Sequence, residues 1–386
     1  MQATAQGWLV IELTNSPALL GLTSAASMAP TLLLSIFAGV VADRVDKRRL
    51  LVVAQLVAAV LSGTLALLTT TETVQFWHVV TLALLSGSVT ALTIPSFQAI
   101  VSTIVDRGLI GSAIALNSAQ YNLARVFAPA IAGLAIAAGG LAIAFWVNTL
   151  SYVIVAVVFA ALPIAAPRAL ASVQAALWSD LLDGIRFASR DRIVAVLVLL
   201  AAAPALFVLN YLALLPVYAR DILEIGAPGL GLLTGAIGLG ALVGAITLAI
   251  ARPSGDSGRL VVGGLAIVSA SLVAFGVSRW LPLSILALAL MGAFQVAYYS
   301  TTNTLIQVLV PARLRGRVLS LYTLTSIGLV PIGNLAAGIV GESFGVEVAL
   351  SGGGLICLVV TGLVVALEPR LLELRAHDLA RRAEAG

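Results

Sequence analysis

Apolar runs long enough to cross a lipid bilayer recur along the whole 386-residue chain. A transmembrane helix needs about 20 consecutive apolar residues, and several runs are longer than that. Only 10% of the residues are charged, whereas a soluble domain averages about 25%, so a soluble core could not hide this apolar surface. The runs are continuous rather than alternating, which excludes a transmembrane β-barrel. The sequence therefore predicts an all-α membrane protein that crosses the bilayer many times.

The apolar runs predict eleven full membrane spans and one fragment, residues 1–13, which is too short to cross. The fragment counts as the first span. The second to twelfth spans are expected at 17–41, 50–69, 77–104, 111–138, 141–164, 193–217, 228–250, 260–278, 281–310, 318–340 and 348–366. Basic residues give the orientation, because cytoplasmic loops are enriched in Lys and Arg. Every loop cation except Arg220 and Arg279 falls on one side. That side, together with the C-terminus, is predicted to be cytoplasmic.

The two halves of the chain repeat each other. "SPALLGLTSA" from Ser16 resembles "APGLGLLTGA" from Ala227, and "RRLLVVAQLVAA" from Arg48 resembles "GRLVVGGLAIVSA" from Gly258. Repeats of this kind belong to transporters that have a central site between the halves. We expect an N-terminal bundle, a cytoplasmic connector with an amphipathic helix, a C-terminal bundle and a cytoplasmic tail, over residues 1–164, 165–192, 193–366 and 367–386.

The repeat also bears on the first helix. Pro17 pairs with Pro228, and the seventh span begins near Arg192. By that pairing, the equivalent first span would begin ~18 residues before Met1. The segment "MQATAQGWLVIEL" is therefore expected to be the outer half of a first helix in an N-terminally truncated chain. It lacks the basic n-region of a signal peptide.

Charge concentrates in one loop, within "FAGVVADRVDKRRLL" at residues 37–51. Gly39 is small, so a neighbouring helix can approach it closely. Asp43 is expected at the end of a helix, where its carboxylate can accept hydrogen bonds from the N-terminal amides of another helix. The alternative is a basic loop that only fixes the topology. That alternative explains the cations but leaves Gly39 and Asp43 unexplained.

Polar side chains within the fifth span are candidates to line a substrate path, because they are costly in lipid unless they face water or a partner. Three of them are spaced by four residues and share one helix face: Asn117, Tyr121 and Arg125. The alternative for Arg125 is a clamp to backbone carbonyls or to Gln98. Further along, Pro129 and Gly133 are expected to bend and thin the helix, which allows close packing as the halves move.

The tenth span carries a second group of polar side chains, and the seventh span carries one amide. These candidates for the substrate cavity are Gln295, Tyr298, Tyr299, Asn303 and Asn210. Tyrosine and amide groups suit an aromatic, partly polar substrate through stacking and hydrogen bonding. The alternative is that they hydrogen-bond between helices.

The remaining functional classes find little support in the sequence. The two histidines are far apart and Cys357 is the only cysteine, so no metal cluster or cofactor is expected. The sequence contains no nucleophile–base pair that would indicate an enzyme. It also contains no Walker motif that would indicate direct use of ATP. The net charge of +4 is loop bias and does not indicate nucleic acid. No carboxylate lies at mid-depth of a span, which leaves Glu12 as a reserve candidate for proton coupling.

The segment "GVVADRVDKRR" resembles the loop 2–3 signature of the major facilitator superfamily: a glycine, three residues, Asp-Arg and then a basic cluster. The segments "GWLVIELTNSPALLGL", "AGVVADRVDKRRLL", "NLARVFAPAIAGLAIAAGG" and "ALNSAQYN" resemble the enterobactin-exporter-like and macrolide-efflux-like branch of its drug:proton antiporters. The resemblance covers essentially the whole chain. It departs at Asp46, where the pattern usually has Gly, and at Ala128, where Gly is common.

This resemblance implies the major facilitator fold, with two six-helix bundles related by a pseudo-two-fold axis and the first helix incomplete. It implies a latch that holds the cytoplasmic side closed, in which the loop meets the start of the eleventh helix. The latch residues would be Gly39, Asp43, Arg44, Arg48, Arg49, Arg315 and Arg317. It also implies a monomer in the plasma (inner) membrane that exports a siderophore or a hydrophobic drug by alternating access, coupled to protons. The alternatives are another cargo, such as a lysolipid or a metabolite, and an inactive truncated membrane protein that does not transport.

Overall fold

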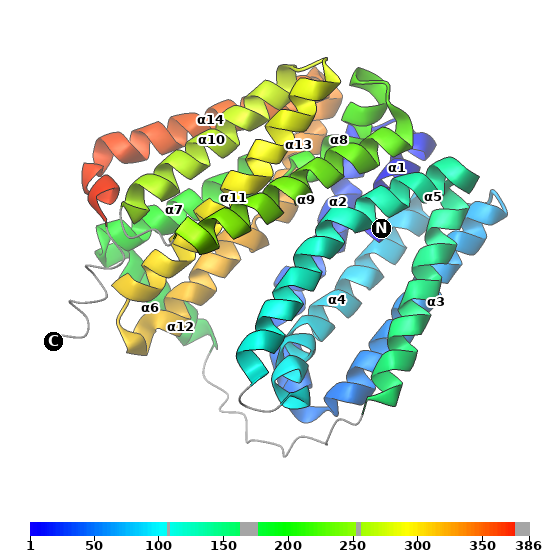
Figure 1. The fold of residues 1–386 in the computed structure, drawn as a ribbon, viewed down its shortest axis with the longest axis horizontal. Coiled ribbons are helices and arrows are strands. Elements are labelled where there is room, and N and C mark those ends of the chain that lie inside the picture. The colour runs from blue at the N-terminus through cyan, green and yellow to red at the C-terminus, as the bar shows by residue number, and fades with distance from the viewer. Residues whose placement is uncertain (106–108, 163–176, 252–255, 375–386) are drawn as a thin grey trace.

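The computed structural model describes residues 1–105, 109–162, 177–251 and 256–374, and every element in these ranges is helical (Figure 1). Ten described segments are long and apolar enough to cross a membrane. Some side chains on these helices lie outside the described part, namely those of residues 35–44, 98–104, 177–183 and several between 110 and 130. The predicted all-α membrane fold is confirmed.

The N-terminal half consists of five helical elements. They are α1 (Gln2–Thr14), α2 (Pro17–Arg44), α3 (Lys47–Thr70), α4 (Phe76–Ile104) and α5 (Ile110–Ala161). α5 leaves helical geometry at Gly139 and Gly140 and turns back, so it supplies two of the predicted spans. Gly140 has a φ of 79°, which a residue with a side chain rarely adopts. α1 has only 13 residues and is too short to cross, as the sequence predicted.

The C-terminal half follows the same pattern with more interruptions. Its elements are α7 (Arg192–Phe207), α8 (Tyr211–Val217), η2 (Tyr218–Ile222), α9 (Gly226–Ala251), α10 (Ser257–Val277), α11 (Leu281–Leu309), α12 (Ala312–Thr323), η3 (Leu324–Gly328), α13 (Val330–Phe344), α14 (Val346–Leu367) and η4 (Pro369–Glu373). The seventh span is divided among α7, α8 and the π-helical turn η2, and the eleventh among α12, the π-helical turn η3 and α13. Pro204, Pro216 and Pro331 lie in these divided spans, and proline removes a backbone donor from the helix ladder.

Between the halves, α6 (Leu177–Arg190) is the helix of the predicted connector. Residues 163–176 of the connector lie outside the described residues. α6 packs against α12, where a Cβ on Gly184 would lie only 2.9 Å from the backbone oxygen of Arg317. The connector helix therefore belongs to the C-terminal half in this conformation.

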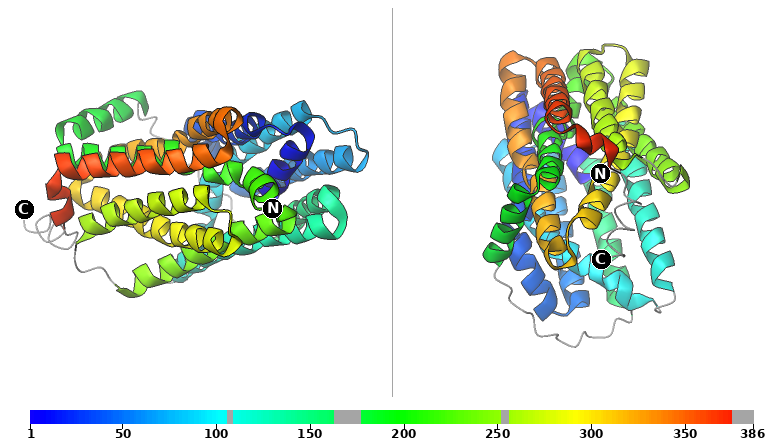
Figure 2. Two further views of the ribbon diagram at one scale, coloured as in Figure 1. Left: turned by 90° about the horizontal axis from the view of Figure 1, so that it is seen from above. Right: turned by 90° about the vertical axis from the view of Figure 1, so that its left-hand side faces the viewer.

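The two halves lie side by side and meet mainly along two helix pairs, α2 with α13 and α5 with α9 (Figures 1 and 2). Small residues allow these backbones to touch. A Cβ on Gly21 would lie 2.5 Å from the backbone oxygen of Asn334, and a Cβ on Gly133 would lie 2.8 Å from that of Ala227. Close approach at small residues is the usual way in which membrane helices pack.

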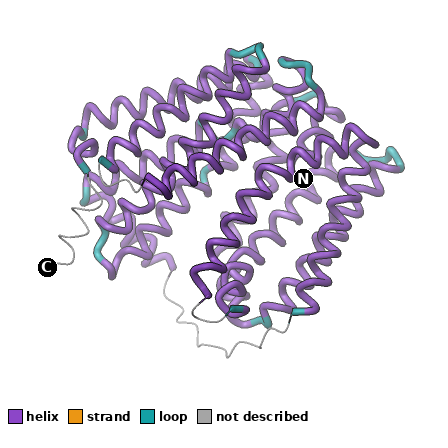
Figure 3. Tube along the Cα trace, in the orientation of Figure 1, coloured by secondary structure: helices purple, strands orange, loops and turns teal. Residues whose placement is uncertain are grey.

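Most of the described loops are short and lie at the two ends of the helices (Figure 3), whereas the break at 208–210 lies within the seventh span. We call one end the closed end, because side chains of both halves are hydrogen-bonded there: Asn15, Ser16, Arg220 and Glu342. We call the opposite end the basic end, because it carries the arginines at the starts of α3, α7 and α12. Figure 1 shows the halves separating toward the basic end, with α12 on one side and the turn between α2 and α3 on the other.

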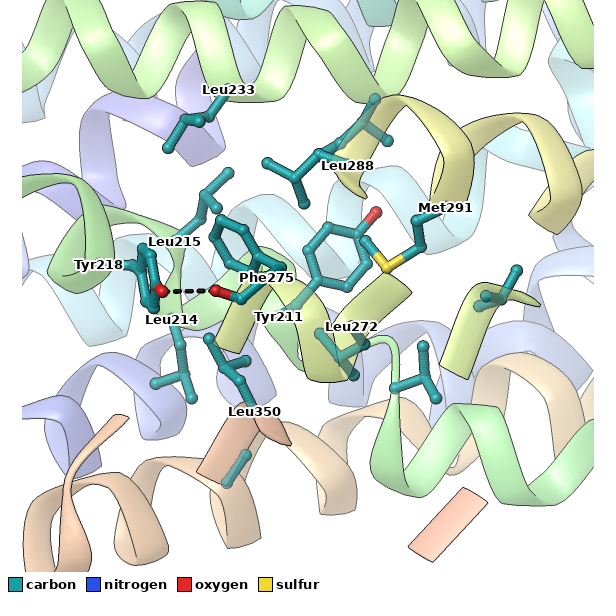
Figure 4. Close-up of a cluster of buried hydrophobic side chains, with 14 of the residues drawn as sticks. Tyr211, Leu214, Leu215, Tyr218, Leu233, Leu272, Phe275, Leu288, Met291 and Leu350 are labelled. Atoms are coloured by element: carbon teal, nitrogen blue, oxygen red, sulfur yellow. Dashed lines mark hydrogen bonds between the residues drawn. The ribbon is translucent and has the colours of Figure 1, made fainter. Parts of the chain in front are cut away.

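The C-terminal half has a large aromatic and aliphatic core built from the divided seventh span and its neighbours (Figure 4). Tyr218 in η2 is fully buried, and its hydroxyl lies 2.5 Å from the carbonyl oxygens of Phe275 and Ser278. A buried hydroxyl that reaches backbone acceptors fixes the helix that carries it. The π-helical turn η2 is therefore anchored to the end of α10.

Candidate functional site

A cavity of about 500 Å³ lies between the two halves. We call it the central cavity. It is lined by α1, α2 and α5 from the N-terminal half and by α8, α9 and α13 from the C-terminal half. The lining residues are Met1, Ala3, Thr4, Gly7, Ser24, Ser27, Met28, Ala124, Ala128, Leu212, Ala213, Leu215, Pro216, Leu230, Thr234, Ile237, Gly238 and Asn334. A pocket at the interface of two repeats is where a transporter binds its cargo.

The described lining of the central cavity carries no ionised side chain. Two of its hydroxyl groups donate to their own helices: Ser27 to the backbone oxygen of Ser24 at 2.8 Å, and Thr234 to that of Leu230 at 2.7 Å. Those hydroxyl oxygens keep lone pairs that can accept hydrogen bonds from a ligand. The side chains of this lining therefore offer apolar surface and hydrogen-bonding groups, with no charged side chain among them.

Asn334 is the most informative polar residue of the lining. Its side chain is 4% exposed and its Oδ1 has no hydrogen-bond partner among the described residues, while its Nδ2 lies 3.8 Å from the sulfur of Met28. An unsatisfied buried acceptor is costly unless something occupies the site. Asn334 Oδ1 is thus an unpaired buried acceptor on a residue that lines the cavity. The sequence reasoning missed it, although an amide in mid-span is a signal of the kind it used elsewhere.

The predicted stripe on the fifth span is only partly described. Asn117 is half-buried, and the side chains of Tyr121, Arg125 and Pro129 lie outside the described residues. Among the described residues of α5, Ala124 and Ala128 line the cavity. The role of Arg125, in the cavity or as a clamp, stays a prediction.

The polar residues predicted on the tenth span are absent from the described lining and lie within the C-terminal half. The hydroxyl of Tyr298 donates to the backbone oxygen of Leu200 at 2.6 Å, and Asn303 accepts from Gln307 at 2.5 Å. Gln295 is also buried. At Tyr298 the contact is the interhelical hydrogen bond that the sequence left open as an alternative.

Two further candidates keep buried atoms without hydrogen-bond partners in the described part of the chain. They are Tyr299, through its hydroxyl, and Asn210, through Oδ1. Asn210 Nδ2 donates to the backbone oxygen of Leu206 at 3.2 Å, so this amide sits at the break between α7 and α8. Both residues are absent from the described lining, and their role in transport stays a prediction.

The predicted latch can be followed for some of its residues. The side chains of Asp43 and Arg44 and the surroundings of Gly39 lie outside the described part of the chain. Arg48 donates to the backbone oxygen of Ala160 at the end of α5, within the N-terminal half. Arg315 is exposed near the start of α12. As noted, Arg317 lies where α12 packs on α6.

Asp46, the departure from the superfamily pattern, has a local role. It is the N-cap of α3, and its Oδ1 accepts from the backbone N–H of Arg49 at 3.0 Å. Aspartate is a favoured N-cap because it satisfies an amide that the helix leaves unpaired. The acid therefore stabilises the start of α3.

At the other end of the molecule, Glu12 accepts from the indole N–H of Trp8 at 2.6 Å.

Comparisons with known proteins agree with this architecture. Residues 1–385 match the family described as Transmembrane secretion effector. The staphyloferrin A transporter of Staphylococcus aureus is 25% identical over 381 residues, covering 96% of this chain and 92% of that protein. The multidrug efflux pump Tap of Mycobacterium tuberculosis is 27% identical over 393 residues, covering 98% and 90%.

A solved structure shows the same fold. The nucleoside transporter NupG superposes with a TM-score of 0.73 at 12% identity, covering 96% of this chain and 93% of that one. At this identity the likeness concerns the fold alone. Together with the family match over almost every residue, it establishes a multi-pass membrane transporter. The chain belongs to the Transmembrane secretion effector family of the major facilitator superfamily.

Proposed function

We propose that this transporter exports a small, weakly polar organic molecule of the hydrophobic-drug type by alternating access, driven by the proton gradient. One observation carries the choice of cargo: the central cavity of about 500 Å³ is predominantly apolar and its described lining carries no ionised side chain. Burial of apolar cargo surface supplies binding free energy of about 25 cal/mol per Å². A multiply charged cargo would instead lose its hydration without gaining a counter-charge from these residues.

Hydrogen-bond acceptors in the cavity refine this proposal. Asn334 Oδ1 has no partner among the described residues. The hydroxyl groups of Ser27 and Thr234 already donate their hydrogens to their own backbones, so their oxygens remain as acceptors. A cargo with one or two N–H or O–H donors on an apolar body would match these acceptors. Drug-sized ligands usually bind in this way, with mostly apolar contacts and a few polar groups that set their orientation.

Alternating access supplies the route. The protein would sit in the inner membrane with the basic end and the C-terminus in the cytoplasm, as positive-inside charge bias favours. Cargo would enter from the basic end, where the halves separate (Figure 1). The predicted latch of Asp43 against the start of α12 would then close that end. Opening of the closed end would release the cargo outside.

A siderophore is the second candidate cargo. It is favoured by the similarity to the staphyloferrin A transporter and by Arg125, the one cation of the sequence within a predicted span. Because siderophores bind iron through hard oxygen donors, an anionic one would need a cationic partner in the cavity. Arg125 is the residue that could provide it.

Transport into everted membrane vesicles tests the proposal. A neutral hydrophobic dye and an anionic catecholate chelator are supplied in parallel, with a proton gradient that nigericin can collapse. The proposal predicts accumulation of the dye, loss of accumulation with nigericin, and strong impairment by Asn334→Leu. Accumulation of the chelator alone, abolished by Arg125→Gln, would establish the siderophore candidate instead. Transport of either compound that survives nigericin would contradict proton coupling.

A further inference from the structure

The turn that joins α1 to α2 is held from both sides by the opposite half of the protein. Arg220 in η2 donates through Nη1 to the backbone oxygen of Ile11 at 2.8 Å and through Nη2 to Oδ1 of Asn15. Glu342, near the end of α13, accepts at Oε2 from the hydroxyl of Ser16 at 2.6 Å and from the backbone N–H of Ala18 at 3.1 Å. A cation and an anion of the C-terminal half therefore flank one turn of the N-terminal half.

Each charge meets the helix end that it stabilises. Asn15 is the left-handed C-cap of α1, with φ 52°, so Arg220 lies at the C-terminal end, where free carbonyls make the helix dipole negative. Ser16 precedes α2, and its Oγ accepts from the backbone N–H of Leu19 at 3.2 Å. Glu342 thus lies at the N-terminal end of α2, where free amides make the dipole positive. Both contacts exist only while the halves are together at this end.

The C-terminal half holds Arg220 in position for this contact. Asp221 binds its guanidinium at two points, Oδ1 to Nε at 2.5 Å and Oδ2 to Nη2 at 2.8 Å. The same π-helical turn is anchored by Tyr218, whose hydroxyl reaches the carbonyl of Phe275 (Figure 4). Because this guanidinium is already oriented, little side-chain entropy is lost when it meets the turn.

Glu342 has a counterpart in Asp43 of the predicted latch. α2 runs from the closed end to the basic end, and α12–α13 run the opposite way, so the two spans are antiparallel neighbours. Glu342 lies near the C-terminal end of α13 against the start of α2. The predicted latch places Asp43, near the C-terminal end of α2, against the start of α12. Each of the two spans would then carry, near its C-terminal end, a carboxylate that meets the free amides at the N-terminal end of the other.

We propose that Glu342 and Arg220 form a gate, which we call the turn clamp, that holds the closed end shut. It is the counterpart of the Asp43 latch at the basic end, and its release opens the central cavity to the outer side. This inference rests on the proposed alternating access. In each half-cycle one of the two dipole contacts forms as the other breaks.

Electron–electron distance measurements across the closed end test the clamp. Spin labels are placed on exposed cysteines introduced at Thr71 in the N-terminal half and Trp280 in the C-terminal half, in a chain with Cys357→Ser, because Cys357 is the only cysteine. Glu342→Gln keeps the side-chain size and removes the charge. Arg220→Gln removes the charge and shortens the side chain, so the guanidinium contacts with Ile11 and Asn15 are lost. We expect each to raise the population of the long-distance, open form about tenfold, and the double variant to raise it further.

The matched control is an ion pair at the same end that lies within one half. Arg279 and Glu347 lie 3.5 Å apart, and both belong to the C-terminal half, so Arg279→Gln and Glu347→Gln should leave the distances unchanged. Unchanged distances in the double clamp variant, or equal shifts in the controls, would overturn the proposal. The vesicle assay separates the two claims. A distance shift with no transport of either compound refutes the proposed cargo and leaves the clamp standing. Transport with no shift refutes the clamp alone.

Discussion

Substitution of Gly338 by alanine should open the closed end of the transporter. Gly338 on α13 packs directly on α2, and a Cβ there would lie 2.7 Å from the backbone oxygen of Pro17 and 3.0 Å from the Cα of Gly21. These neighbours are backbone atoms and cannot swing away. To restore van der Waals separation, the two helices must move apart by roughly 0.7 Å.

The cost falls on one conformation only. Overpacking of this kind costs about 1–3 kcal/mol, and it applies while α2 and α13 are in contact at the closed end. In the opposite conformation that the proposed alternating access requires, the two helices would part here and the added methyl group would lose this clash. A difference of that size changes the ratio of the two conformations about 5- to 150-fold in favour of the open form.

The spin-label distance across the closed end is the assay, with Gly352→Ala as the control. Gly352 on α14 has no atom within 4 Å of its Cβ position, so alanine there should change neither the distances nor the thermal stability. The reasoning is refuted if Gly338→Ala leaves the distance distribution unchanged. It is also refuted if Gly352→Ala shifts the distribution equally.

Three further substitutions separate stability from transport. Asp46→Ala should lower the free energy of unfolding by about 1 kcal/mol through loss of the α3 N-cap, read as a lower melting temperature with the cargo profile retained. Tyr298→Phe removes the 2.6 Å bond to Leu200 and should cost about 1 kcal/mol of stability, and a changed cargo profile would instead place Tyr298 in the transport path. Thr234→Val should weaken cargo affinity severalfold. Thr361→Val is its control, because it loses an equivalent 2.7 Å bond to its own helix but lies outside the described cavity lining, and it should leave the affinity unchanged. Equal losses of affinity would contradict the cavity assignment.

The fold follows from the sequence because it depends on long apolar runs. A span is recognised by length and hydropathy alone, and the reversal within α5 falls at the Gly139–Gly140 pair that the predicted spans already avoided. The division of the seventh and eleventh spans by π-helical turns was not predicted. Those breaks depend on how neighbouring helices take up the backbone groups that Pro204, Pro216 and Pro331 leave unpaired.

The site could be predicted less well, because it depends on the rotation of each helix. Polar residues such as Tyr298 and Asn303 stood out in the sequence, yet their partners lie within one half. The cavity is lined largely by small and apolar residues, including Ala124 and Ala128, which no single sequence distinguishes from lipid-facing ones.

The turn clamp has a trace in the sequence. Arg220 and Arg279 were the two loop cations on the outer side, against the positive-inside bias. The structure gives both a partner, since Arg220 holds the α1–α2 turn and Arg279 lies 3.5 Å from Glu347. One of the two exceptions to the positive-inside rule, Arg220, thus lies at a contact between the halves.

Access to the central cavity from the two ends tests the central claim most directly. A cysteine at Ser27, which lines the cavity, is labelled in the Cys357→Ser background with a membrane-impermeant thiol reagent, applied to intact cells and to everted vesicles. The account predicts strong labelling in everted vesicles, where the basic end faces the reagent, and weak labelling in intact cells that rises about tenfold with Glu342→Gln. Equal labelling from both sides before that substitution, or no rise after it, would contradict alternating access controlled by the turn clamp.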